Sequence, residues 1–229
     1  MNNSHSFPEW LPNTGYPSQS VSDGELQAYL LNGVSRTFAL TIPQLPAALA
    51  GVVSNAYLLC RIIDTIEDEP ALEPARKRYF CQWFTAVVEA KLLAEPFAEE
   101  LAPLLSPHTI PAEHELIRWM PRVIAITHSL TRPQQEALVC CVRLMAGGMA
   151  EFQENHNPYG LNNLLQLNRY CYFVAGVVGE MLTKLFCDYS PDIAQRREAL
   201  MNLAVSFGQG LQMTNILKDI WDDQNRGAC

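Results

Sequence analysis

Two short acidic segments of this 229-residue chain share one pattern, an aspartate followed three and four positions later by two further acidic residues. The first is DTIED at Asp64–Asp68, and the second is DIWDD at Asp219–Asp223. Residues three and four apart lie on the same face of a helix, so each segment would place its carboxylates side by side. These like charges repel each other, and near a helix C-terminus they also oppose the helix dipole. Such an arrangement needs a compensating cation.

Mg²⁺ suits these side chains, because this hard cation binds one or two carboxylates together with phosphate oxygens and water. A single acidic segment at a helix end is most often solvated surface. Here both segments follow strongly apolar runs, and Asn215 lies one turn before the second and adds an amide oxygen. Two such faces across a cavity would hold a diphosphate through bound metal. The candidate ligands for Mg²⁺, with Mn²⁺ as an alternative ion, are Asp64, Glu67, Asp68, Asn215, Asp219 and Asp223.

Basic residues that an anion would require lie close to both acidic segments in the sequence. Arg61 precedes Asp64 by one turn, Lys218 directly precedes Asp219, and Arg36 follows Ser35 in the segment SRTF. Each one taken singly is more often a surface charge or an ion-pair partner of its acidic neighbour. Together they give the candidate site a means of binding a diphosphate.

The segments that must position these residues read as helices. Ser22 and Glu25 have capping-box spacing, and apolar residues recur with helical period from Ala47 until Pro70 stops the pattern. No segment alternates with a period of two for long enough to require a strand, so we expect an all-α fold. The expected helices cover residues 22–33, 47–69, 74–94, 111–129, 133–154, 162–187 and 191–223.

One domain is expected, covering residues 22–229, after a flexible lead-in at residues 1–21 that contains several prolines. The stretch from Ala94 to Pro111 holds three more prolines and is expected to be an internal connecting loop. The hydrophobic fraction of 48%, with 17% charged residues, is typical of a folded globular chain.

The net charge of −8 argues against sequence-independent binding of nucleic acid. Seven cysteines without a CxxC pair argue against a disulfide framework or a zinc site and favour reduced thiols. No signal peptide is recognised, and the longest apolar stretch, residues 42–60, is interrupted by Pro43, Pro46 and Gly51. We therefore expect a cytoplasmic protein without a membrane span, which a lipid-like substrate could still draw to a membrane surface.

Four segments between Ser35 and Asp223 resemble the ordered signature blocks of the squalene and phytoene synthase family: SRTFAL, YLLCRIIDTIEDE, RYCYFVAGVVGEML and GQGLQMTNILKDIWDD. The resemblance implies a single helical bundle around a deep apolar cavity. It also implies that two aspartate-rich helices face each other and bind Mg²⁺ and the substrate diphosphate. By this resemblance Asp64, Asp68, Asp219 and Asp223 take the metal roles, and Asn215 joins the coordination.

The same resemblance implies roles for residues around the metal. Arg36, with Ser35 beside it, and Arg61 match positions that hold diphosphate oxygens, and Lys218 replaces what is often an arginine. That exchange keeps the positive charge but loses the bidentate fork. The remaining matches are Gln212, which lines the reaction site, and Tyr57 and Tyr170, which lie near the reacting carbons, with the more direct role for Tyr170. Without the family, a tyrosine on an apolar helix face is more often a packing residue.

Glycines recur in the third and fourth blocks, at Gly176, Gly179, Gly208 and Gly210, and a further pair is Gly147-Gly148. Glycine lowers helix propensity, so these positions are expected to allow close helix approach or to leave room for a prenyl chain.

The favoured reaction is the head-to-head condensation of two farnesyl diphosphates through presqualene diphosphate to squalene, with Mg²⁺ and reduction by NADPH. SRTFALTI and DTIEDEP favour this branch over phytoene or dehydrosqualene synthesis, which loses a proton instead. No GxGxxG segment is present, so a nicotinamide site is unassigned. The rival functions are a non-catalytic homologue or assembly subunit, and a trans-prenyl synthase or terpene cyclase. A monomer is expected.

The sequence stops six residues after the second acidic segment, whereas members of the family continue through further helices. We therefore expect a C-terminally incomplete chain with at most trace synthase activity. Leu211, Ile216 and Leu217 would then lack neighbours and form exposed apolar surface.

Overall fold

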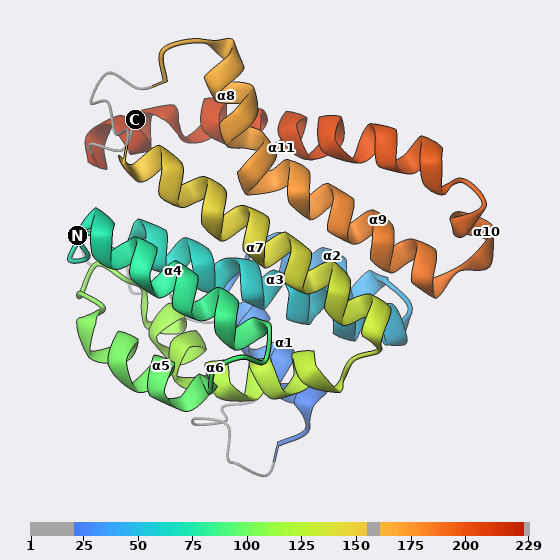
Figure 1. The fold of residues 1–229 in the computed structure, drawn as a ribbon, viewed down its shortest axis with the longest axis horizontal. Coiled ribbons are helices and arrows are strands. Elements are labelled where there is room, and N and C mark those ends of the chain that lie inside the picture. Colours follow the sequence, from blue (N-terminus) through green and yellow to red (C-terminus); the bar gives the residue numbers. More distant parts are fainter. Residues whose placement is uncertain (1–20, 155–160, 227–229) are drawn as a thin grey trace, which may run out of the picture.

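The computed structural model describes residues 21–154 and 161–226, which form an all-α bundle (Figure 1). The flexible lead-in expected at residues 1–21 lies outside this part except for its last residue. No strand occurs among the described residues, which confirms the expected fold class.

Eleven α-helices are found in the described part of the chain, together with two 3₁₀ turns, Ile42–Gln44 and Ala102–Leu104, and a π-helical segment, Tyr172–Gly176. The α-helices are α1 (Asp23–Val34), α2 (Phe38–Thr41), α3 (Ala47–Asp68), α4 (Pro74–Val88), α5 (Ala94–Leu101), α6 (Pro111–Ser129), α7 (Arg132–Glu154), α8 (Leu164–Cys171), α9 (Val177–Tyr189), α10 (Pro191–Ala194) and α11 (Arg197–Arg226).

The start of α1 is the capping box that the sequence predicts. The Glu25 amide donates to Ser22 Oγ at 3.3 Å, and the Ser22 amide donates to Glu25 Oε2 at 2.8 Å. Two amides that the helix leaves unsatisfied are thus paired. Leu26, Leu30 and Leu31 then bury the inner face of this helix.

The expected loop between Ala94 and Pro111 is wrong, because it contains α5 and a 3₁₀ turn. Ala94, Phe97, Ala98 and Leu101 are buried on one face of α5. Pro96 lies in the first turn, where the backbone amide has no partner within the helix in any case, so it does not interrupt α5. Pro103 lies in the 3₁₀ turn, and Pro107 lies in the hydrogen-bonded turn that follows.

Two of the expected helices are modified locally. The helix expected at residues 162–187 is α8 and α9 joined through the π-helical segment Tyr172–Gly176, and the last one is divided into α10 and α11. A π turn inserts one residue into a helix and is frequent at functional sites.

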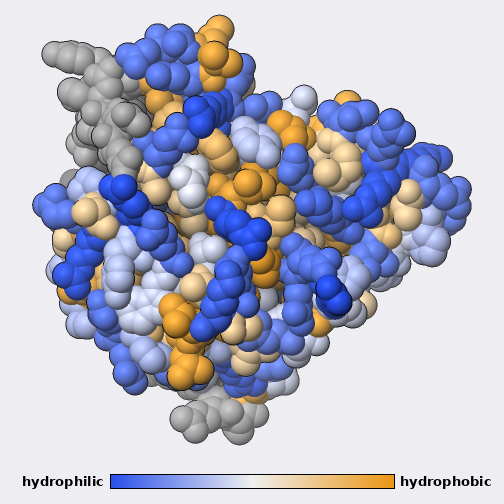
Figure 2. All heavy atoms as spheres, in the orientation of Figure 1, coloured by the Kyte–Doolittle hydropathy of each residue, from blue (hydrophilic) through white to orange (hydrophobic). Residues whose placement is uncertain are grey.

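Helix α3 lies at the centre of the bundle and packs against α1, α4, α6, α7 and α9. Its apolar stripe is fully buried, including Leu58, Ile62, Ile63 and Ile66. Helices α5 and α6 lie on one side of α3, whereas α11 lies across α9 and the π segment on the other (Figure 1). Figure 2, in the same orientation as Figure 1, shows mostly polar side chains around the edge of the visible face and apolar ones toward its middle.

Close approach between α11 and the α9 region depends on two glycines, as the sequence predicts. A Cβ added at Gly179 would lie 2.3 Å from the Ala204 carbonyl oxygen, and one at Gly208 would lie 2.3 Å from that of Ala175. Gly148 likewise lies against the Phe173 ring. Close approach is not found at Gly147 or Gly210, where an added Cβ would meet nothing within 4 Å.

Apolar surface is exposed along α11, at Leu203 (65%), Phe207 (67%), Leu211 (48%) and Leu217 (73%). The exposure expected at Leu211 and Leu217 is confirmed, whereas Ile216 is half-buried. The six described cysteines are all free thiols.

The expectation that no segment is apolar enough to span a membrane was too strict. Residues Ala47–Asp68 and Leu164–Tyr189 meet the criteria of length and composition. The first is α3, and 67% of its apolar window is buried in the bundle, which is typical of a core helix.

Candidate active site

Tyr57, Arg61, Asp64 and Asp68 follow each other on α3 at spacings of four, three and four residues, so they lie on one face of the helix. The buried leucine and isoleucine stripe fixes the opposite side of α3 in the core. The Arg61 and Asp64 side chains are 27% and 28% exposed. Packing of α3 therefore presents a row of side chains in which Tyr57, Arg61 and Asp64 are half-buried and Asp68 is exposed.

Asp64 has an unusual protonation equilibrium. Its pKa is raised from 3.8 to about 7. Burial is the main cause, the charge of Arg61 partly opposes the rise, and the nearby Asp68 and Glu113 carboxylates add to it. A carboxylate that is difficult to ionise in the metal-free protein becomes favourable once a cation binds to it. A cation bound beside Asp64 would therefore offset the cost of burying its charge.

Arg61 lies between two carboxylates. Its Nη2 donates to Glu113 Oε1 on α6, and its Nη1 is 3.9 Å from Asp64 Oδ2. Burial alone would lower the pKa of Arg61, but the Glu113 and Asp64 charges raise it above its ordinary value. Glu113 is 8% exposed and is separated from Arg61 by 52 positions, so no local sequence pattern could have identified it.

The end of α3 is fixed by Glu69, a second carboxylate outside the sequence prediction. Its side chain is fully buried and accepts hydrogen bonds from the amides of Ala71 and Ser106 and from the Thr109 hydroxyl, at 2.7–2.8 Å. Burial would raise its pKa, but these hydrogen bonds lower it below its ordinary value. Glu69 therefore ties the first acidic segment to the connection before α6.

Lys77 on α4 donates from its ammonium to the Glu67 carbonyl oxygen. A cation at this position stabilises the C-terminal end of α3, where the helix dipole is negative. It offsets part of the repulsion that the acidic segment imposes. The only signal in the sequence was a basic cluster soon after Pro74.

Tyr170 lies beside the first acidic segment, although 102 positions separate it from Asp68. Burial raises the pKa of its hydroxyl well above 10, and the charges of Glu67, Asp64 and Asp68 raise it further. Its ring contacts Phe152 edge-on, with centroids 5.5 Å apart. The phenol is therefore held protonated next to the carboxylates.

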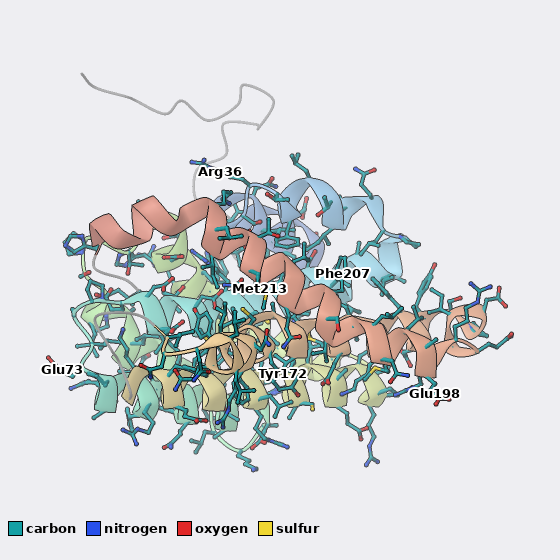
Figure 3. All side chains as sticks on the ribbon, turned by 90° about the horizontal axis from the view of Figure 1, so that it is seen from above. Arg36, Glu73, Tyr172, Glu198, Phe207 and Met213 are labelled. Carbon is teal, nitrogen blue, oxygen red and sulfur yellow. The ribbon has the colours of Figure 1, made fainter. Side chains whose placement is uncertain are left out.

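The SRTF segment packs onto Tyr57. The Tyr57 hydroxyl donates to the Val34 carbonyl at 3.3 Å, and the rings of Phe38 and Tyr57 are 5.2 Å apart. Burial raises the pKa of Tyr57, and hydrogen bonding with Ser35 and the charge of Arg61 oppose this rise. Ser35 thus lies next to Tyr57, which precedes Arg61 by one turn on α3. Arg36, in contrast, is exposed (Figure 3).

Helix α11 carries the second set of predicted residues. Gln212 is half-buried, and Asn215 and Lys218 are exposed. The Asp219 and Asp223 side chains lie outside the described part, so their metal roles stay predictions. In Figure 3, α11 crosses between the segment that carries Arg36 and the one that carries Tyr172. It packs on α8, the π segment and α9, and α9 in turn packs on α3.

The chemistry of the first acidic segment fits Mg²⁺, because Asp64 and Asp68 offer carboxylate oxygens and burial makes the charge of Asp64 unfavourable despite Arg61 nearby. Within the described part of the chain, no three acidic, histidine or cysteine side chains converge on one point. One helix face alone therefore supplies part of a coordination shell, and the rest would come from phosphate oxygens, water and further side chains.

A surface pocket of about 410 Å³ lies between α4 and α7 and is lined in part by Arg78, Cys81, Arg143 and Gly147. It contains none of the predicted site residues. The raised pKa of the Cys81 thiol, about 12, follows from burial and from the Glu67 carboxylate nearby.

Comparisons with known proteins find relatives in sequence and in fold. A probable squalene synthase of Neurospora crassa is 32% identical over 194 residues, which cover 82% of this chain and 38% of that protein. The squalene synthase of Saccharomyces cerevisiae is 32% identical over 210 residues, covering 90% and 45%. A solved complex of TcSQS with the ligand BPH1237 has a TM-score of 0.67 and 25% identity, covering 88% of this chain and 55% of that one.

The chain thus spans less than half the length of these two curated relatives. Residues 31–229 match the family described as squalene/phytoene synthase, and this range contains every candidate site residue. On the strength of this match and of the relatives' identity, the chain belongs to the squalene/phytoene synthase family.

Proposed function

We propose that this protein is a prenyltransferase that joins two farnesyl diphosphates head to head into presqualene diphosphate and converts this product into squalene. The observation that carries the proposal is the meeting of Arg61, Asp64 and Tyr170 in one half-buried region of a chain of this family. These groups supply a cation, a metal ligand and a protonated phenol, which are the functions that the reaction requires.

Binding of the diphosphate is assigned to Arg61 and Arg36, with Ser35 beside Arg36 and Lys218 on α11. Arg61 Nη1 lies 3.9 Å from Asp64 Oδ2, so a diphosphate held beside Asp64 would contact a guanidinium and the metal ligands together. Arg36 is exposed and can reach the substrate as it enters. Gln212 is assigned to the lining of the reaction site.

Mg²⁺, when bound, would neutralise the departing diphosphate and so favour cleavage of its bond to the allylic carbon. Asp64 and Asp68 would hold it on α3, with Glu67 adjacent, and Asn215, Asp219 and Asp223 would hold it from α11. The half-buried position of Asp64 strengthens its electrostatic interactions relative to those in water.

Tyr170 is assigned to the reacting carbons, with Tyr57 next to Arg61. The first farnesyl diphosphate loses its diphosphate, and the double bond of the second attacks the resulting allylic cation. Loss of one proton then closes the cyclopropane ring. The aromatic face of Tyr170 stabilises a passing cation, and its hydroxyl, protonated at neutral pH, relays the proton toward the released diphosphate.

In the second step, presqualene diphosphate would lose its diphosphate and rearrange, and NADPH would supply the hydride that converts the resulting cation into squalene. No described residue is assigned to the nicotinamide.

We place the protein in the cytoplasm as a monomer that contacts membranes peripherally, in keeping with the apolar product and with two exposed leucines at the start of α8, Leu164 and Leu165. Sedimentation tests the monomeric state, and flotation with phospholipid vesicles tests the contact with membranes.

The assignment of the metal is tested by exchanging one ligand on each helix. Asp64→Asn and Asp219→Asn should each remove Mg²⁺-dependent consumption of farnesyl diphosphate while the helical circular dichroism signal stays unchanged. The reason is that a lost ligand weakens metal binding without emptying the core. Near-wild-type turnover in both variants would refute the assignment.

A further inference from the structure

Glu113 is a nearly buried carboxylate that the chemistry above does not use. It lies in the first turn of α6, where the helix dipole favours a negative charge, and its side chain is 8% exposed. Its Oε1 accepts a hydrogen bond from Arg61 Nη2 across the interface between α6 and α3. On its other side, Arg61 Nη1 is 3.9 Å from Asp64 Oδ2.

The two contacts of Arg61 are unequal. The Glu113 contact is a direct hydrogen bond, whereas 3.9 Å to Asp64 exceeds hydrogen-bond length. Arg61 Nε is buried and has no hydrogen-bond partner within the described part of the chain. A guanidinium that turned toward Asp64 could pair both Nε and a terminal nitrogen with that carboxylate, in the usual bidentate geometry. Glu113 opposes this turn by holding Nη2 on the other side.

We infer that Glu113 is a positioning residue that holds Arg61 off Asp64 and thereby keeps the Asp64 oxygens available to Mg²⁺. The inference rests on the proposed function, in which Asp64 binds the metal. A guanidinium that formed a bidentate pair with Asp64 would compete with the metal for the same oxygens. Glu113 prevents this competition and leaves Arg61 close enough to meet a diphosphate.

Glu113 can do this because its own position is fixed. Glu69 at the end of α3 accepts from the Ser106 amide and the Thr109 hydroxyl, so the segment leading into α6 is tied to the acidic end of α3. The link between Arg61 and Glu113 is a second tie between the same two parts of the fold. Two ties prevent α6 from following Arg61 toward Asp64.

Titration of the purified protein with Mg²⁺ alone, at pH 8, tests the inference by calorimetry and by the rise in melting temperature. Glu113→Gln should weaken Mg²⁺ binding roughly tenfold or more, a typical effect of removing a partner just outside the coordination shell. The double variant Glu113→Gln with Arg61→Gln should recover most of the affinity, because the competing guanidinium is gone. Glu115→Gln is the matched control, since Glu115 is 13% exposed and pairs with Arg118 on its own helix at 2.9 Å.

The double variant separates positioning from a general effect on folding. If Glu113 acted only through stability, Mg²⁺ affinity would stay weak when Arg61 is also replaced. That result, or an unchanged affinity in Glu113→Gln, would overturn the inference while the wild-type response to Mg²⁺ leaves the metal assignment intact. A wild-type protein that binds no Mg²⁺ would overturn both.

Discussion

Gly208 on α11 lies directly against the backbone of Ala175 in the π-helical segment, with room for no side chain between them. A Cβ at position 208 would come 2.3 Å from the Ala175 carbonyl oxygen and 3.0 Å from Gly176 Cα. This contact sets how closely α11 approaches the helix that carries Tyr170. The two parts of the candidate site are therefore held at a distance that depends on glycine.

Gly208→Ala should destabilise the protein by roughly 1–3 kcal/mol, because backbone atoms must move to admit the methyl group. Gly210→Ala is the control on the same helix, where an added Cβ meets nothing within 4 Å. That variant should be neutral or more stable by up to about 1 kcal/mol through helix propensity alone. Urea denaturation measures both, and equal stability of the two variants would contradict the packing described.

Asp64 should make the metal-free protein less stable as the pH rises. Its pKa of about 7 in the folded protein exceeds the ordinary 3.8, so its favourable contribution is fully present below about pH 4. That contribution is lost as the pH rises through 7. With Mg²⁺ removed by a chelator at pH 8, Asp64→Asn should be more stable than the wild type, by on the order of 1–3 kcal/mol.

Addition of Mg²⁺ should reverse this order, because only the wild type gains the metal. Melting temperatures with and without Mg²⁺ measure the effect for both proteins. An Asp64→Asn variant that is less stable than the wild type in the presence of chelator would show that Asp64 has a structural rather than a metal-binding role.

Glu69 should contribute stability with the opposite dependence on pH. Its pKa is lowered in the folded protein, so its contribution is present above the ordinary value of 4.5 and is lost as the pH falls through the folded value. Glu69→Gln should cost roughly 1–3 kcal/mol at pH 7, since buried donors lose their acceptor. Glu73→Gln, at the start of α4 and without a side-chain capping bond, is the control. Equal chemical-denaturation midpoints would contradict the role of Glu69.

Tyr170→Phe keeps the aromatic ring and removes only the hydroxyl. If this hydroxyl relays a proton, formation of presqualene diphosphate should slow by roughly 10²–10⁴-fold. Tyr172→Phe is the control. The pKa of the Tyr172 hydroxyl is raised by burial, Glu180, Cys140 and Cys141, and not by the acidic segment. Single-turnover rates with farnesyl diphosphate distinguish the two variants, and an unchanged rate in Tyr170→Phe would leave that residue as packing.

Patterns that are local in sequence predicted the fold well. The capping box at Ser22 and Glu25 and the apolar stripe of α3 act through neighbours one turn away, so the residues themselves identify the helix. Helix α5 was missed because prolines at helix starts resemble prolines in loops. Its buried face, Ala94, Phe97, Ala98 and Leu101, already shows the helical period.

The site was predicted only where its residues share a helix or a family block. Tyr57, Arg61 and Asp64 lie on one face of α3 for that reason. Glu113 was beyond prediction because it meets α3 through space, 52 positions away from Arg61. The same holds for Ser106 and Thr109, which donate to Glu69 from 37 and 40 positions away. The π turn was also beyond prediction, since it adds one residue to a helix without a sequence signal of its own.

The most direct test of the proposed function is product identification with protein purified at its natural length. Farnesyl diphosphate and, separately, geranylgeranyl diphosphate are incubated with Mg²⁺, with and without NADPH, and the products are identified by mass spectrometry. Presqualene diphosphate without NADPH, and squalene from farnesyl diphosphate only when NADPH is added, are the predicted results. A C40 product from geranylgeranyl diphosphate, or no Mg²⁺-dependent consumption of either substrate, would contradict the assignment of squalene synthesis.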